Sequence, residues 1–90
     1  MYSLLISSQF EKDIFLVEKR GKNMSELDVV VKILENGKKL PQRYKNHKLK
    51  NIQPETWDCH IQPDWVLLYA KDKKNKIVKL IRTGAHSDLF

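Results

Sequence analysis

The sequence contains one cysteine, three glycines and three prolines among its 90 residues. The single cysteine, Cys59, excludes an intramolecular disulfide framework and a cysteine-based zinc finger, and it favours a reducing compartment. The longest uninterrupted apolar run, residues 65–70, is far shorter than the ~20 residues that a membrane span requires. The apolar stretch at residues 2–6 is too short for a secretory signal and follows no basic segment. We therefore expect one domain over residues 1–90, a cytoplasmic location and no membrane partner.

Acidic residues are absent from residues 37–50, a segment that carries six lysine and arginine side chains. The whole chain has a net charge of +6, so this segment alone accounts for the excess. A second basic cluster follows at residues 71–79, with Asp72 as its only acidic residue. Clustered positive charge is typical of a protein that binds nucleic acid. The alternative is a lysine-rich surface that only contacts solvent.

The hydrophobic pattern predicts an α+β fold with the element order β-α-α-β-β-β. A strand at residues 2–7 is followed by a capping-box sequence at Ser8–Glu11 and a helix that ends near Gly21. Asn23 caps a second helix, and the short connection between the helices predicts an antiparallel hairpin. Residues 40–54 are predicted to be a long loop, and residues 56–61, 65–70 and 76–83 to be strands. We expect a mostly antiparallel four-stranded sheet with the helix pair packed on one face.

All three histidines follow residue 46, and their neighbours carry charge. His47 lies in the basic loop, and His86 follows the last strand. Strand alternation places His60 on the same face as Asp58, opposite Trp57, Cys59 and Ile61. Asp64 begins the central strand, so these groups can converge on one face or rim of the sheet. Histidines among cations suit phosphodiester cleavage, in which one group deprotonates the attacking hydroxyl and another protonates the leaving oxygen.

Other interpretations of the same residues remain open. Each histidine alone is commonly a surface or capping residue, and three histidines with an aspartate also form a plausible zinc ligand set. No H-E-x-x-H or C-x-x-C pair supports zinc, and we expect no metal. Tyr44 and Phe90 are the aromatic residues expected to reach solvent, where a ring can stack on a base. Trp57 is expected in the core, and Trp65 either in the core or beside the site.

Four segments form a more specific pattern. They are Leu40-Pro41, residues 44–49 (YKNHKL), residues 58–65 (DCHIQPDW) with the apolar run to Tyr69, and residues 82–90 (RTGAHSDLF). Together they resemble the YafQ-type branch of the RelE/ParE toxin superfamily, and the strand-helix-helix start agrees with that RelE-like fold.

The resemblance implies a toxin of a bacterial type II toxin–antitoxin system. Such toxins are endoribonucleases that cut mRNA, typically on the translating ribosome, and inhibit translation until a cognate antitoxin binds them. They use no metal or cofactor: the 2′-OH of the RNA attacks the neighbouring phosphate, and a 5′-OH fragment leaves. Operator DNA is expected as a partner only of the toxin–antitoxin complex.

The resemblance also implies roles for individual residues. The family's catalytic positions match His47, His60, Asp64 and His86, with Arg82 stabilising charge on the scissile phosphate. Lys45 would assist Arg82, Phe90 would orient the nucleotide, and Asp58 would orient His60 or contact the base. The remaining expected substrate contacts, from the basic loop itself, are Tyr44, Lys48 and Lys50. With an aspartate in reach, His60 is the better candidate for the base, and His86 for the acid.

Two positions depart from the family pattern, and one alternative function stays open. Asn51 stands where the family often has glycine, but asparagine tolerates a positive φ angle, so we expect the loop to be kept. Ala85 replaces a frequent serine or threonine and removes one hydroxyl. ParE-type members act on gyrase and are not ribonucleases. The alternative is therefore a non-catalytic module that acts through nucleic acid or such a protein target, and it would not need the histidines.

Overall fold

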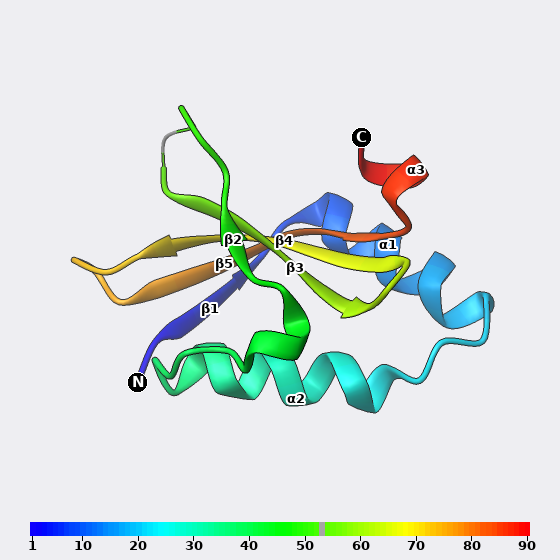
Figure 1. Ribbon diagram of the computed structural model, residues 1–90, viewed down its shortest axis with the longest axis horizontal. Coiled ribbons are helices and arrows are strands. Elements are labelled where there is room, and N and C mark those ends of the chain that lie inside the picture. The colour runs from blue at the N-terminus through cyan, green and yellow to red at the C-terminus, as the bar shows by residue number, and fades with distance from the viewer. Residues whose placement is uncertain (53) are drawn as a thin grey trace.

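The computed structural model describes residues 1–52 and 54–90, which form a sheet with helices before and after it (Figure 1). The elements are β1 (Ser3–Ile6), α1 (Ser8–Lys19), α2 (Met24–Glu35), the 3-10 helix η1 (Gln42–Tyr44), β2 (His47–Lys48), β3 (Thr56–Gln62), β4 (Trp65–Asp72), β5 (Ile77–Gly84) and α3 (His86–Leu89). In the described part of the chain, no helix has both the length and the apolar character needed to cross a membrane.

The strands form one five-stranded mixed sheet in the order β1-β5-β4-β3-β2. β1 runs parallel to β5, and the other neighbouring pairs are antiparallel. The expected α+β class is confirmed, but the expected four-stranded sheet is wrong because β2 adds a fifth strand. β2 has only two residues, too few to show an alternating pattern in the sequence. The central position predicted for residues 65–70 is confirmed, since β4 lies in the middle of the sheet and is largely buried.

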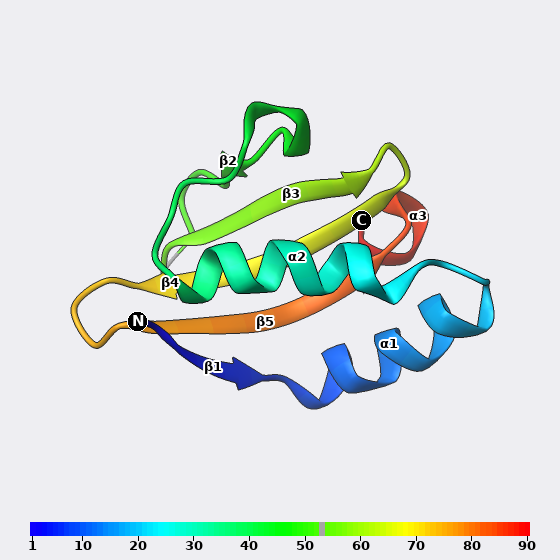
Figure 2. The same ribbon diagram turned by 90° about the horizontal axis from the view of Figure 1, so that it is seen from below.

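α2 crosses one face of the sheet and α1 lies alongside β5 at the sheet's edge (Figure 2), and the apolar stripes of both helices join one core. α1 packs mainly on β5, and α2 packs on β3, so each helix docks on its own strand. This arrangement differs from the expected antiparallel hairpin. The cap at Asn23 is confirmed, because its side chain accepts the N–H of Ser25. The cap of α1 is Ser7, one residue before the predicted position, and its hydroxyl also donates to the Ile81 carbonyl at 2.7 Å.

The core lies between the helices and one face of the sheet. Along β3, Cys59 and Ile61 are buried toward the helices and Trp57 is half-buried beside them, as the alternation predicts. Trp65 is a core residue, and its indole N–H donates to the Thr83 hydroxyl at 2.8 Å. The opposite face of the sheet carries no long helix, so polar groups can be presented there. We call it the open face; in Figure 1 it is the side of the sheet away from α2.

Residues 40–54 are more ordered than the predicted loop, although Gln53 lies outside the described residues. They contain η1 and β2, and Leu40 and Tyr44 anchor the segment because both are buried. The backbone φ angle of Asn51 is 59°, so asparagine adopts there the conformation that glycine favours, as expected. Lys45 also has a positive φ of 48°, which turns the chain just before β2.

Candidate active site

Strand register places the expected polar residues of β2, β3 and β5 on one face of the sheet. His47 pairs with Asp58, Asp58 pairs with Leu68, and Leu68 pairs with Arg82. Directly paired residues in antiparallel strands point to the same face, so this row crosses four strands on the open face. His60 lies two residues beyond Asp58 on β3, about 7 Å further along the same face.

A β-bulge in β5 is responsible for the direction of Arg82. Tyr69 pairs with Leu80, whereas its neighbour Leu68 pairs with Arg82, so Ile81 is an extra residue without a partner on β4. In a regular strand Leu80 and Arg82, which are two residues apart, would point to the same face, because side chains alternate with a period of two. The bulge therefore leaves Leu80 in the core and turns Arg82 to the open face.

Three rings from separate elements gather at the end of the open face. The rings of His60 and His86 have centroids 5.3 Å apart, and those of His86 and Phe90 are 5.6 Å apart. α3 carries His86 and lies next to the turn between β3 and β4, which follows His60 (Figure 1). Phe90 is exposed, as expected for a ring that stacks on a base. The structure thus brings two of the three histidines into direct contact.

The third histidine pairs with the aspartate that was expected to serve His60. The Nδ1 atom of His47 lies 2.9 Å from Oδ1 of Asp58, within ion-pair distance. Asp58 is only 4% exposed, and its Oδ1 receives no hydrogen bond from the described residues. A buried carboxylate oxygen without a donor is costly. A small rotation of the exposed His47 ring would direct Nδ1–H to this oxygen.

Arg82 is held in place by a residue that the sequence did not single out. Its Nε and Nη2 donate to the two carboxylate oxygens of Asp13 in α1, each at 3.0 Å. The Thr83 N–H donates to the same carboxylate at 3.1 Å. Burial alone would raise the pKa of Asp13, but these bonds and one from Gln9 hold it below its ordinary value. The bond to Asp13 also raises the pKa of Arg82, whose Nη1 stays available for a phosphate.

Asp64 and Asp88 fix the start of α3, and hence the place of His86. Asp64 Oδ1 lies 3.5 Å from the backbone nitrogen of His86, so Asp64 contacts α3 rather than either imidazole. Asp88 accepts the Ala85 N–H at 2.9 Å and pairs with Arg20 of α1 at 2.6 Å. The bond from Arg20 keeps the pKa of Asp88 below its usual range. Sequence reasoning missed Asp13, Arg20 and Asp88, because the pairs Asp13–Arg82 and Arg20–Asp88 join residues that are distant in the chain.

The expected substrate-binding residues are distributed around the site. The expectation that Tyr44 reaches solvent is wrong: the ring is 6% exposed, and its hydroxyl accepts a hydrogen bond from Arg43 at 2.7 Å. Lys45 and Lys50 are exposed, and Lys48 pairs with Glu55 at 3.5 Å. A cavity of about 240 Å³ beside His60 is lined by Arg43, Tyr44, Lys45, His60, Ile61, Gln62 and Pro63. Tyr44 is thus part of a cavity wall and is not a free stacking surface.

Comparison with known proteins identifies the family. Residues 2–90 match the family model described as a bacterial toxin of the type II toxin–antitoxin system, YafQ. The chain belongs to the YafQ toxin family. It is 39% identical over 85 residues to the mRNA interferase toxin YafQ of Escherichia coli strain B / BL21-DE3, a match that covers 93% of this chain and 90% of that relative.

Solved structures agree with this assignment. A chain of the crystal structure of the E. coli DinJ–YafQ complex has a TM-score of 0.91 and 36% identity, covering 100% of this chain and 99% of that one. A metal-bound toxin from Helicobacter pylori has a TM-score of 0.92 and 34% identity, and the match covers both chains completely. The order of helices and strands is therefore that of the YafQ fold.

The zinc alternative requires several ligand side chains close together in the folded chain. Among residues 1–52 and 54–90, no three His, Cys, Asp or Glu side chains are close enough together to hold a metal ion. Cys59 is fully buried, and burial raises the pKa of its thiol to about 12, so it stays protonated in the core. The described residues therefore supply no preformed set of three metal ligands.

Proposed function

We propose that this chain is the toxin of a type II toxin–antitoxin system and cleaves mRNA as an endoribonuclease. The observation that carries the proposal is the contact between the His60 and His86 rings at 5.3 Å, beside the exposed ring of Phe90. Two adjacent imidazoles can accept and donate a proton at neutral pH, as cleavage of a phosphodiester by a 2′-OH requires. The family assignment and the interferase name of the E. coli relative support the same reaction.

His60 is the proposed general base, for a reason other than a neighbouring aspartate. Asp58 contacts His47, so that carboxylate does not serve His60. The Nδ1 atom of His60 instead lies 3.3 Å from the Pro63 carbonyl. If Nδ1 carries the proton and donates it there, Nε2 has the free lone pair that can accept the 2′-OH proton.

His86 is the proposed general acid. The 2′-oxygen forms a bond to phosphorus as the bond from phosphorus to the 5′-oxygen breaks, and His86 protonates that leaving oxygen. The products are a 2′,3′-cyclic phosphate and a 5′-OH end, so the step consumes no water, metal or oxidant. Negative charge grows on the phosphoryl oxygens, where Nη1 of Arg82, together with Lys45, would stabilise it.

The remaining polar residues have supporting roles in this proposal. Asp58 holds His47, whose other ring nitrogen, Nε2, is free to contact the phosphate or sugar. Asp64 positions the beginning of α3 and so acts on His86 indirectly. Phe90 stacks on one base next to the scissile phosphate, and Lys48 and Lys50 attract the RNA backbone.

The proposed partners follow from the reaction and the family. The E. coli YafQ toxin has been solved in complex with DinJ, and we propose that this chain likewise binds a cognate antitoxin. Translated mRNA on the ribosome is the proposed substrate, which would place the activity in the cytoplasm. Operator DNA would be bound only by the toxin–antitoxin complex.

Separate His60→Ala and His86→Ala variants test the reaction on a defined mRNA, with and without ribosomes. Each should lose about 10²–10⁴-fold in cleavage rate while still binding RNA. The wild-type protein should cleave in excess EDTA and leave cyclic phosphate ends. The double variant, purified identically, controls for contaminating nucleases. Unchanged cleavage in both single variants would refute the roles assigned to the two histidines, and an absence of cleavage by the wild-type protein would favour a non-catalytic binding module.

A further inference from the structure

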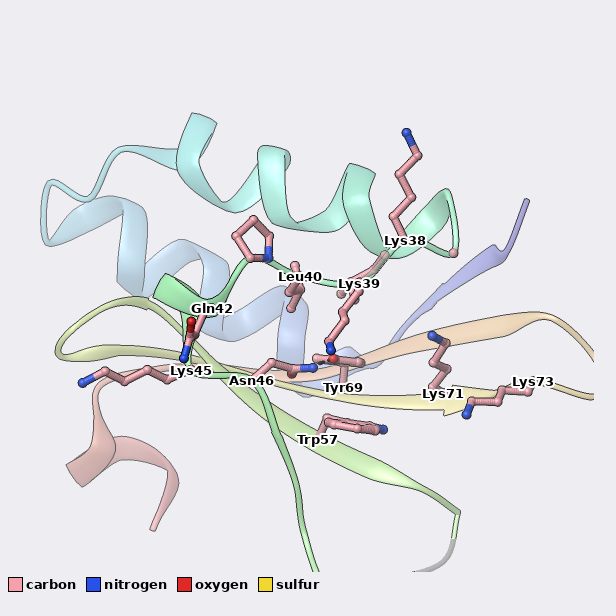
Figure 3. A pocket seen from close by; sticks show the side chains of 13 residues that line it. Lys38, Lys39, Leu40, Gln42, Lys45, Asn46, Trp57, Tyr69, Lys71 and Lys73 are labelled. Atoms are coloured by element: carbon pink, nitrogen blue, oxygen red, sulfur yellow. Dashed lines mark hydrogen bonds between the residues drawn. The ribbon is translucent and has the colours of Figure 1, made fainter.

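A second cavity, of about 760 Å³, lies between the sheet and the segment that joins α2 to β2, and it is lined almost entirely by residues that the proposed reaction does not use. It is bounded by the end of α2, the segment that follows it, and strands β3 and β4 (Figure 3). Five lysines contribute to its walls: Lys38, Lys39, Lys45, Lys71 and Lys73. None of the described residues that line it is acidic. We call this cavity the lysine groove.

The floor of the lysine groove is rigid and closed. Tyr69 is 2% exposed, and its hydroxyl donates to the Asn46 side chain at 2.7 Å, which ties β4 to the segment before β2. In Figure 3 the Lys39 side chain points from the segment after α2 toward Tyr69 and Asn46. Positive charge is thus arranged on a fixed surface, so a ligand would not have to order the backbone on binding.

The lysine groove and the cavity beside His60 share one lining residue, although Tyr69 in the groove faces the helices and His60 lies on the open face. Lys45 lines the groove, and it also lines the smaller cavity that contains His60. It directly precedes Asn46 and His47, at the outermost strand of the sheet. In Figure 3 its side chain extends away from the other four lysines. An RNA strand that leaves His60 and His86 and passes over the β2 edge of the sheet would meet Lys45 first and then the groove.

The chemistry of the groove fits a phosphodiester backbone better than a protein segment. A peptide that docks on a protein normally inserts apolar side chains into pockets, and charge at the rim adds specificity. Here the large apolar residues Leu34, Leu40 and Tyr69 are already buried. Large exposed apolar side chains lie instead on other elements, at Leu5, Ile6, Phe15, Leu16 and Val29. The groove therefore offers mainly charge, which suits a ligand with regularly spaced anions.

We infer that the lysine groove binds the phosphodiester backbone of the RNA strand whose scissile phosphate lies between His60 and His86. The inference rests on the proposed ribonuclease function and extends it to nucleotides outside the cleaved step. Contacts between the groove and the RNA would stabilise the bound substrate and the transition state equally. Its loss should raise KM for a long RNA and leave kcat unchanged.

The test compares two triple variants of equal charge. The groove variant carries Lys38→Gln, Lys39→Gln and Lys73→Gln, and the control carries Lys12→Gln, Lys19→Gln and Lys32→Gln on α1 and α2. All six lysines are exposed, so both variants should fold, which thermal melting verifies. Binding is measured with a 2′-O-methyl RNA, which the 2′-OH mechanism cannot cleave, over a range of salt concentrations.

The groove variant should bind the long RNA more weakly than the control does. Its plot of log affinity against log salt should be shallower by about 2, because each lost contact with a single strand removes roughly 0.7. Cleavage of a trinucleotide, too short to reach the groove, should be the same in both variants. Equal affinities and equal slopes in the two triple variants would overturn the inference.

Two further outcomes separate this inference from its alternatives. If polyglutamate of matched charge bound more tightly than RNA, and lost that affinity only in the groove variant, the groove would be a site for an acidic protein and the inference would be wrong. If the His60→Ala and His86→Ala variants cleaved normally, the proposed reaction would fail. The binding test with uncleavable RNA would still decide whether the groove contacts RNA.

Discussion

Asp13 of α1 binds both Nε and Nη2 of Arg82 at 3.0 Å, so a helix near the N-terminus orients the proposed phosphate-binding residue of β5. The carboxylate also accepts the Thr83 N–H at the edge of β5, beyond the last residue that pairs with β1. The buried Asp13 carboxylate therefore bonds a backbone N–H of β5 that β1 does not reach, and it leaves Nη1 of Arg82 free to bind a phosphate.

Replacing Asp13 should weaken both folding and cleavage. The Asp13→Asn variant keeps the size of the side chain but loses its charge and one acceptor, so the free energy of unfolding should fall by about 1–3 kcal/mol. Urea unfolding measures this loss. Because Arg82 is then less well oriented, kcat should also fall, by roughly tenfold, or ~1.4 kcal/mol. Asp28→Asn, an exposed site on α2, is the matched control. A variant as stable and active as this control would contradict the role of Asp13.

The same carboxylate should make stability depend on acidic pH. Its folded-state pKa is lowered, whereas in the unfolded chain the value is about 3.9. The stabilisation is therefore complete above the unfolded value and is lost as the pH falls through the folded one. Urea midpoints measured from pH 5 to pH 2 should fall more steeply for the wild type than for Asp13→Asn. Parallel curves would show that other groups govern acid unfolding.

Asp58 and His47 should act as one unit in catalysis. Because the Asp58 carboxylate contacts His47 Nδ1 at 2.9 Å, Asp58→Asn should disturb the ring that His47→Gln removes. Each variant should lower kcat by roughly tenfold, and the double variant should lose little more than the larger single loss. The measurement is a double-mutant cycle, in which cleavage rates are compared for the wild type, the two single variants and the double variant. Additive losses would instead mean that the two residues act separately, with Asp58 contacting the nucleobase or orienting His60.

Gly84 should matter for the position of α3. A Cβ atom at this residue would lie 2.9 Å from Oδ2 of Asp88, which accepts the Ala85 N–H. Gly84→Ala should therefore shift α3 and separate His86 from His60. The cleavage rate should fall strongly, whereas the melting temperature should change little. Loss of the NMR contact between the two imidazoles would report the shift directly. Ser87→Ala, an exposed change in the same helix, is the control and should leave both quantities unchanged.

Local patterns in the sequence predicted much of the fold and the choice of polar residues. Alternation on β3 separated Cys59 and Ile61 from Asp58 and His60, because a strand has a strict period of two. The cap at Asn23 and the positive φ angle of Asn51 follow from the chemistry of one side chain. The turn at residues 72–75 is also local, and Asp72 accepts the N–H of Asn75 there. Each of these features depends on neighbours in the chain.

Features that depend on distant partners were not predictable in this way. β2 is a strand only because His47 and Lys48 pair with β3. The burial of Tyr44 and the link between Asp13 and Arg82 arise from packing between separate elements. The aspartate two residues from His60 on the same face proved to contact a different histidine on the neighbouring strand. Spacing along one strand identifies a shared face, but only the neighbouring strand determines which pair forms.

The bulge at Ile81 makes the pairing of β5 with β4 more critical than the composition of β5. Another side chain at this position would still place the guanidinium of Arg82 outside the hydrophobic layer. A strand of the same length that paired with β4 without the bulge would reverse the alternation for everything that follows Ile81, and would turn the cation toward the helices. Such a shift in pairing would remove phosphate recognition even though every proposed catalytic side chain was still encoded.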